Sequence, residues 1–397
     1  MNSLPLSLPV ARTGAGTGWA VLAYFLLFPG FFAYHSLLGL GQIRAFLGGY
    51  FAPIAFVFAP GLLAIYLHRL RRGDERFTTA DAGFWAFQLF FSLVVCVQTL
   101  ADANPGVLAN HSFALVYLLD TFIIFKCLDL RSDSLRRWNL LAVMAMSATV
   151  FAFAVDGVFY LGALGAAKDP EAVATYQGFS RSYLAAITVA IAAARSLPER
   201  WLLYAIGLPS LYLNAARSEF VALIVLLPLV ELALARHKLA LLACMSAAAL
   251  LLWSQREDLL ALLPQNRMLE LLDLSQSTSA NLRHQLAEQA WQTIRAHPWL
   301  GDYGSYQVGY YAHNIYSAWV DLGLFGFVFL LLLIALPALH AGAALHLGRR
   351  RSPFLLQAWA FLASTLLLLF TSHYFADMLI GVSLGAYARA LMEDTHG

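Results

Sequence analysis

Long apolar segments constrain the fold of this chain more than any other feature of its sequence. Several of them reach the roughly 20 apolar residues that a helix needs to cross the hydrocarbon core of a bilayer. Hydrophobic residues make up 60% of the chain and charged residues 12%, whereas a soluble domain has about 25% charged residues. The strict alternation expected of outer-membrane barrel strands is absent. The sequence therefore predicts an all-α, polytopic integral membrane protein.

The apolar segments predict about twelve membrane-spanning helices. They divide the chain into transmembrane helices over 1–253, one large polar loop over 254–313, and three further transmembrane helices within 314–397. Two of the spans are short, so each of these could be tilted, broken or partly inserted. The predicted spans are 19–40, 47–67, 81–101, 112–128, 139–165, 178–195, 201–214, 218–235, 239–254, 314–340, 354–371 and 374–391.

Basic residues in the short loops predict the orientation of these spans. Most of the 25 lysine and arginine residues fall in loops that share a side with both termini. The positive-inside rule then places both termini in the cytoplasm and the polar loop on the outer face. The N-terminal segment lacks the features of a cleaved secretory signal, so we expect the first span to act as a signal anchor.

The polar loop is rich in arginine, although basic residues normally avoid the outer face. It contains Arg256, Arg267, Arg283 and Arg295, and Arg217 joins two neighbouring spans on the same side. Guanidinium groups bind phosphate and carboxylate groups in a bidentate manner. An outward cluster of arginines at a membrane surface therefore predicts an anion-binding site.

The second half of the loop has a helical and then an aromatic composition. Apolar residues recur at helical spacing over 279–297, which predicts an amphipathic helix with Arg283 in its first turn and a stop at Pro298. Arg267 lies in a leucine-rich segment expected along the membrane interface. Four tyrosines follow Pro298, among them Tyr311. They could stack on sugar rings, or they could belong to the aromatic belt that membrane proteins share.

His313 and Asn314 stand where the next apolar helix begins. The positive end of that helix disfavours a second proton on the imidazole, which would keep His313 neutral and available as a base near pH 7. The alternative is that this histidine simply marks the start of the helix.

Acidic residues predicted within spans are candidates for function, because a charge at mid-bilayer costs at least about 2.5 kcal/mol. Glu219 could orient Arg217 or neutralise it. His373 and Asp377 flank the last outer turn and could line the same cavity. For Asp120 and Asp156, hydrogen bonds between helices are an equally good explanation.

Metal-site patterns such as DxD, HExxH and CxxC are missing from the outward loops, so we expect neither a metal nor another cofactor. The near-neutral net charge of +2 says little about partners, and nothing points to nucleic acid. A phosphate-bearing substrate would be held by arginines, each charge-assisted bond contributing roughly 1.5 to 3 kcal/mol.

Several of these motifs occur together in one known family. An arginine near the start of a helix, the run HPWLG and the dipeptide HN opening a glycine-punctuated span resemble the O-antigen ligase and polymerase superfamily. The outward NAARSEF turn is similar to a turn of that family. The resemblance covers about residues 200–340. The family usually reads PxxGxG in this loop, whereas this chain has Tyr303 at the second glycine, which leaves the backbone turn and any close approach of this loop to phosphate open.

The resemblance implies a GT-C-like helical architecture and a multi-pass protein of the bacterial inner membrane. It implies that Arg217 and Arg283 hold the pyrophosphate of an undecaprenyl-pyrophosphate-linked glycan and that His313 is the base. The glycan would pass to a sugar hydroxyl of lipid A-core at the periplasmic face, without a metal and with inversion. Residues expected to assist substrate binding are Asn314, Arg267, Tyr311, Glu219 and His373.

Other functions remain open at this stage. An O-antigen polymerase and a protein O-oligosaccharyltransferase belong to the same superfamily and would look similar in sequence. A secondary transporter also has about twelve spans, but it is expected to show paired broken helices in two related halves. A purely structural membrane protein would leave the outward arginines unexplained.

Overall fold

The computed structural model describes residues 15–46, 49–101, 103–264, 266, 268–271, 278–347 and 352–394. Apart from one isolated bridge between Val155 and Val158, every regular element in these ranges is helical. The prediction of an all-α protein is therefore confirmed. The helices are α1 (Ala15–Phe25), η1 (Leu26–Gly30), α2 (Phe31–Gly39), α3 (Phe51–Arg72), α4 (Thr79–Leu100), α5 (Pro105–Cys127), α6 (Asp133–Phe153), η2 (Leu161–Leu164), η3 (Pro170–Ala172), α7 (Tyr176–Ala193), α8 (Leu197–Leu213), α9 (Arg217–Leu234), α10 (Lys238–Ser254), α11 (Arg256–Leu262), η4 (Leu269–Leu271), α12 (Thr278–Ala296), α13 (Tyr316–His346), α14 (Pro353–Thr371) and α15 (Leu379–Asp394).

Six helical segments of the described chain are long and apolar enough to cross a membrane, or seven if α10 and α11, which meet at a bend of 69°, form one span. They are Gly18–Gly39, α3, α4, α5, α13 and α14. This result supports a membrane-embedded protein. The remaining predicted spans coincide with α6 to α9 and α15, which are shorter or carry more charge, so the count of twelve stays a prediction.

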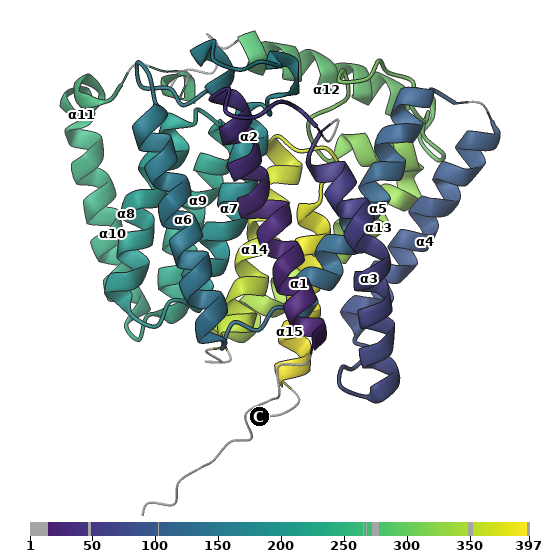
Figure 1. Cartoon of the computed structure of the whole chain (residues 1–397), viewed down its shortest axis with the longest axis horizontal. Coiled ribbons are helices and arrows are strands. Elements are labelled where there is room, and N and C mark those ends of the chain that lie inside the picture. The colour runs from purple at the N-terminus through teal and green to yellow at the C-terminus, as the bar shows by residue number, and fades with distance from the viewer. Residues whose placement is uncertain are drawn as a thin grey trace, which may run out of the picture.

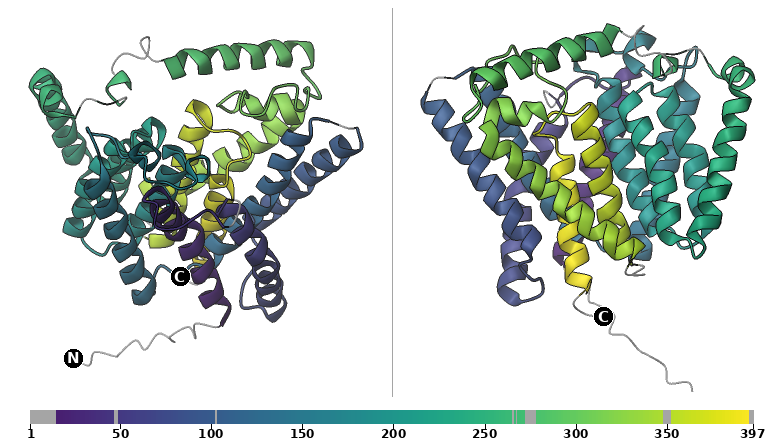
Figure 2. Two further views of the ribbon diagram at one scale, coloured as in Figure 1. Left: turned by 45° about the horizontal axis from the view of Figure 1, so that its top comes forward. Right: turned by 180° about the vertical axis from the view of Figure 1, so that it is seen from behind.

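Most helices run side by side, and α12 lies across one end of the bundle (Figure 1). The start of α1 and the end of α15 lie at the opposite end, as the two further views in Figure 2 also show. The amphipathic pattern predicted over 279–297 is confirmed as α12, in which Leu286, Ala290 and Ile294 are buried. The helix begins one residue earlier than predicted, so Arg283 lies in its second turn and not in its first.

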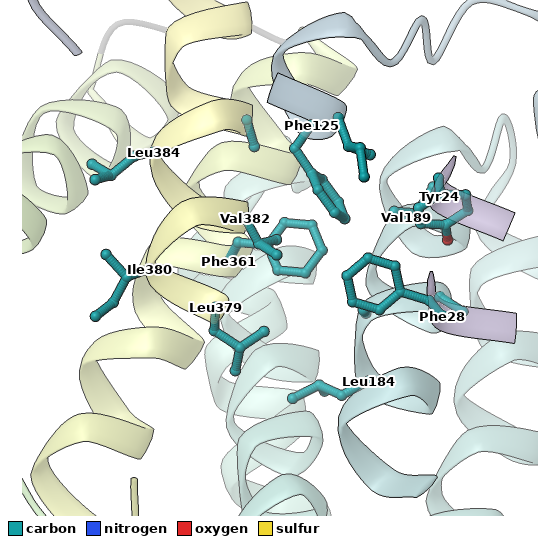
Figure 3. Packing of buried hydrophobic residues seen from close by; sticks show 14 of the residues in the cluster. Tyr24, Phe28, Phe125, Leu184, Val189, Phe361, Leu379, Ile380, Val382 and Leu384 are labelled. Atoms are coloured by element: carbon teal, nitrogen blue, oxygen red, sulfur yellow. The ribbon is translucent and has the colours of Figure 1, made fainter. Parts of the chain in front are cut away.

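The core is formed where α5, α14 and α15 meet α7 and the N-terminal helices (Figure 3). Aromatic side chains such as Phe125 and Phe361 fill this centre, with ring centroids 5.2 Å apart. α15 approaches α5 closely through Gly381 and Gly385, where an added Cβ would lie 2.4 Å and 2.2 Å from carbonyl oxygens of α5. Small residues spaced by four allow this backbone contact in membrane helices.

Two span boundaries predicted from the sequence are wrong. The span expected over 139–165 ends as a helix at Phe153, and the exposed Asp156 lies in a turn beyond it with a positive φ of 48°. The last helix begins at Leu379 rather than near 374. After Thr371, the last residue of α14, the rest of the run TSHYFAD forms a loop, in which His373 and Tyr374 are bonded to Glu219 and Asp321 of other helices. Asp120 does lie within α5, fully buried, and its carboxylate has no hydrogen-bond partner among the described residues.

Candidate functional site

A cavity of about 320 Å³ opens at the end of the bundle that carries α12. Its wall combines α5 and α7 with two loops, one between α12 and α13 and one between α14 and α15. The residues of chemical interest in this wall are His111, Arg181, Tyr306, Tyr311, His313, His373, Tyr374 and Asp377.

A break in α13 holds the loop that leads to His313. Gly323 has φ 69° and ψ −176°, a conformation essentially restricted to glycine, and it interrupts the helix. The HPWLG segment lies against this break, where the Leu324 N–H donates to the Trp299 carbonyl at 3.1 Å. A Cβ added to Gly323 would lie 2.3 Å from that carbonyl oxygen, so the close approach requires glycine.

The departure from the PxxGxG pattern is explained by the same loop. Positive φ angles fall on Gly301 (71°) and Gly304 (65°), and Tyr303 between them does not need one. The buried Tyr303 hydroxyl lies 2.6 Å from His111 Nδ1 on α5. Tyr303 at the second glycine position therefore anchors the loop to α5, and the conformations that need glycine fall on Gly301 and Gly304.

Asp321 is the centre of a buried hydrogen-bond network behind the cavity. Its carboxylate accepts from the Gly304 N–H at 2.9 Å, from the Tyr306 hydroxyl at 2.7 Å and from the Tyr374 hydroxyl. Tyr374 also lies 2.5 Å from His111 Nε2. The network connects α5, α13 and both cavity loops, and it therefore fixes the loops relative to each other. The sequence interpretation singled out none of these four side chains except Tyr306, as one of the loop tyrosines.

His373 lies between two carboxylates in the loop between α14 and α15. Its Nε2 is 3.3 Å from Glu219 Oε1 and its Nδ1 is 3.1 Å from Asp377 Oδ2. Arg181 Nη1 lies 3.4 Å from the same Asp377 oxygen. Burial opposes charge on His373, but Asp377 and Glu219 raise its pKa above the usual value. Burial also opposes charge on Asp377, and Arg181 with His373 holds its pKa well below the usual range.

His313 is half-buried and, unlike His373, favours the neutral form of its imidazole. Burial, followed by the positive charges of Arg283, His373 and Arg181, lowers its pKa to about 4. Its ring lies 4.6 Å from the Tyr311 ring, and it makes no hydrogen bond with any residue that the structure describes. The imidazole is therefore neutral near pH 7 and available to a ligand in the cavity. The sequence interpretation expected neutrality from the helix end, whereas burial and nearby cations cause it here.

The other site residues proposed from the sequence do not all lie in the cavity wall. Tyr311 lines the cavity, and burial raises its pKa against the opposing charges of Arg181 and Arg283. The half-buried Arg283 is therefore close enough to act on both Tyr311 and His313, although it does not line the cavity. Asn314 accepts from the Tyr316 N–H at 3.0 Å and so stabilises the turn that leads into α13. Arg217 opens α9 two residues before Glu219 and is half-buried, but it does not line the cavity. Arg267 lies outside the described residues.

Arg181 is the main residue that the sequence interpretation missed. It lies on α7 in the cavity wall and pairs with Asp377. The available signal was an arginine within an apolar predicted span, which is a functional candidate by default.

The cavity contains cationic groups but no evident metal ligands. Over the described ranges, no three histidine, cysteine, aspartate or glutamate side chains are grouped so that they could hold a metal ion. Positive charge is instead supplied by Arg181 and His373 in the wall, and by Arg283, which is not part of the wall but whose charge acts on His313. Comparison of the chain with protein-family models and with curated proteins finds no match.

Proposed function

We propose that this protein is an O-antigen ligase of the bacterial inner membrane. It would transfer a glycan from undecaprenyl pyrophosphate to a sugar hydroxyl of lipid A-core, with the cavity facing the periplasm and both termini in the cytoplasm. The observation that supports this proposal is a neutral His313 that shares one cavity with Arg181 and His373, in a membrane-embedded helical bundle, with the charge of Arg283 also acting on its ring. A base next to an anion site is what this transfer requires.

In the proposed reaction, the pyrophosphate of the donor binds near Arg181, Arg283 and the His373 imidazolium. The acceptor oxygen attacks the anomeric carbon from the side opposite the pyrophosphate, and His313 takes the proton of the hydroxyl. The bond between the anomeric carbon and the phosphate oxygen breaks, and its electron pair leaves with undecaprenyl pyrophosphate. Attack from the opposite side inverts the anomeric centre. The cations stabilise negative charge that develops on the leaving group.

Arg181 takes the role that the family resemblance assigned to Arg217, because Arg181 lines the cavity and pairs with Asp377. Arg283 keeps its role because its charge acts on His313, although neither it nor Arg217 lines the cavity. Asp377 lies between Arg181 and His373, so it can hold both cations in place. Apolar side chains also line the cavity, namely Phe31, Phe51, Ala114 and Met378. This wall suits the first isoprenyl units of the donor.

The membrane topology belongs to the same proposal. All twelve predicted segments carry a helix, and α12 lies across the end that holds the cavity. A bundle of twelve spans with residues 254–313 as a periplasmic loop would place the lipid-linked donor at the membrane surface beside Arg181. The architecture would then be GT-C-like, as the family resemblance implies.

The test is transfer by the purified protein reconstituted with lipid-linked glycan and lipid A-core in excess EDTA. Wild-type protein should remain active. His313→Ala should lower kcat by about 10²- to 10⁴-fold, as expected for loss of a general base. Arg181→Gln and Arg283→Ala should each weaken donor binding by about 10- to 100-fold, because each removes a charge-assisted bond.

Arg295→Ala is the matched control, since this arginine lies on α12 with Arg283 but packs on Trp291, with its guanidinium carbon 5.4 Å from the ring centroid, and does not line the cavity. Metal-dependent transfer, or full activity of His313→Ala, would contradict the mechanism. Deleting the gene should leave long glycan on undecaprenyl pyrophosphate. Single repeats on lipid A-core would identify a polymerase instead, and solute uptake by the purified protein would identify a transporter.

A further inference from the structure

A second cavity of about 310 Å³ adjoins the charged one. It lies between α12 and the loop that follows this helix, and Tyr306 and Tyr311 line both cavities. Beyond these shared tyrosines, the two walls differ between consecutive residues: Ala312 lines the second cavity and His313 lines the first. The two cavities therefore meet at Tyr306 and Tyr311, and the Tyr311 ring lies 4.6 Å from the ring of His313, the proposed base.

The second cavity differs from the first in its chemistry. Within the described part of the chain its wall contains no charged or histidine side chain. The side-chain amides of Gln289 and Gln307 are exposed and make no hydrogen bond to another described residue. Neutral hydrogen-bonding groups next to aromatic rings suit a sugar, whose hydroxyls donate and accept while its apolar face stacks on a ring. Besides the shared Tyr306 and Tyr311, the polar side chains in the wall are Gln289, Thr293, Ser305, Gln307, Tyr310 and Ser317.

We infer that this second cavity binds the acceptor, as the terminal neutral sugar of a glycan, and presents a hydroxyl of that sugar to His313. The inference rests on the proposed glycosyl transfer and adds to it the place of the acceptor. The pyrophosphate occupies the charged cavity because its cations are there, and the uncharged acceptor sugar occupies the neutral one. The volume lies at the lower end of the roughly 300 to 1,000 Å³ range of small-molecule sites, which is enough for the end of a glycan.

The acceptor hydroxyl then enters from the α12 side and the donor from the side of Arg181. The acceptor oxygen forms the new bond to the anomeric carbon at the boundary marked by Tyr306 and Tyr311. Its proton passes to His313, and the pyrophosphate leaves on the far side. Separate cavities for the acceptor and the pyrophosphate would let the hydroxyl attack from the side opposite the leaving group, as inversion requires.

The test compares the double variant Gln289→Leu/Gln307→Leu with Gln292→Leu. Leucine keeps the size of glutamine and removes its hydrogen bonds, and Gln292 is an exposed residue of α12 outside both cavities. We expect the double variant to raise the KM for the acceptor by about tenfold or more, since each lost neutral hydrogen bond weakens binding by about two- to tenfold. The donor KM and kcat should stay within about twofold of wild type, and Gln292→Leu should match wild type.

A binding measurement without the donor separates this inference from the proposed function. Saturation-transfer NMR with the core oligosaccharide released from lipid A should show binding to wild type and to Gln292→Leu, and little to the double variant. If wild type binds this oligosaccharide and the double variant does not, yet wild type transfers no glycan, the ligase proposal fails and the assignment of the cavity stands. If wild type transfers glycan and the double variant has unchanged acceptor KM and unchanged NMR signals, the assignment of the cavity is wrong.

Discussion

Two histidines in the charged cavity have opposite protonation preferences. Burial and nearby positive charge lower the pKa of His313 to about 4, so its imidazole is neutral near pH 7. Two carboxylates overcome burial and raise the pKa of His373, so its imidazolium is favoured. Active sites often use groups whose surroundings drive their pKa values apart. The neutral ring can accept a proton, whereas the charged ring cannot act as a base and instead attracts an anion.

This difference predicts the acid limit of the transfer reaction. Protonated His313 cannot act as the base, so kcat/KM should fall as pH drops through about 4, and not near 6.5 as for an ordinary histidine. Arg283→Gln removes one positive charge near the ring. The pKa of His313 should then rise and the acid limb should move to higher pH. A pH profile of kcat/KM for both proteins checks this, and a wild-type limb near 6.5 would contradict it.

At the scale of elements, the broken helix α13 connects the fold to the site. Its first part carries Asp321, which holds the tyrosines of both cavity loops. The break at Gly323 receives the HPWLG segment, and this segment leads along the loop to His313. The position of the base therefore depends on a glycine ten residues away from it in sequence and on a backbone contact between the two segments.

Gly323→Ala tests this dependence. Alanine is strained at φ 69° and ψ −176°, and its Cβ would meet the Trp299 carbonyl. We expect a loss of about 1 to 3 kcal/mol in the free energy of unfolding, together with a lower kcat because the loop shifts. Gly18→Ala in α1 is the control, since its Cβ would meet no atom within 4 Å. Thermal unfolding in detergent, followed by tryptophan fluorescence, should separate the two; equal midpoints would contradict this role of Gly323.

At the scale of the whole molecule, the two ends of the bundle use charge differently. Away from the cavity, basic side chains are paired with carboxylates between helices, as in Lys126 with Asp81 at 2.5 Å and Arg200 with Glu231 at 2.6 Å. Breaking such a buried pair by removing one partner typically costs about 3 to 5 kcal/mol, so these contacts hold helices together. At the cavity end, the carboxylates of Asp377 and Glu219 face the cations Arg181 and His373. The additional charge of Arg283 nearby makes this group of residues net positive, which favours an anionic ligand.

This difference between the ends predicts an orientation in the membrane. Single cysteines would be placed in a background that lacks Cys96, Cys127 and Cys244. Ser305→Cys, in the exposed loop at the cavity end, should react with a membrane-impermeant maleimide added outside spheroplasts. Arg71→Cys, exposed at the other end of the bundle on α3, should react only after the membrane is opened. The reverse pattern of labelling would place the cavity in the cytoplasm and overturn the periplasmic assignment.

The helical class, the position of most helices and the amphipathic α12 could be predicted from the sequence, because each depends on residues that are neighbours along the chain. Apolar runs long enough to cross a bilayer and a period near 3.6 are local patterns. His313 could be singled out for the same reason, since it stands at a visible helix boundary. The end of α6 was misplaced because apolar residues continue past Phe153 although the backbone turns there.

The composition of the cavity was decided only by the tertiary structure. His373 meets Glu219 across 154 residues of sequence, and His111 meets Tyr303 across 192. No local pattern reports such contacts, so the sequence could mark Arg181 as an arginine within an apolar span but could not show that it shares a cavity with His313 and His373. The protonation of each histidine also depends on these distant neighbours and on burial, since water and nearby charge set the free energy of the charged form. The sequence by itself determined the helices and the base candidate, and the packing of distant helices decided which charges surround it.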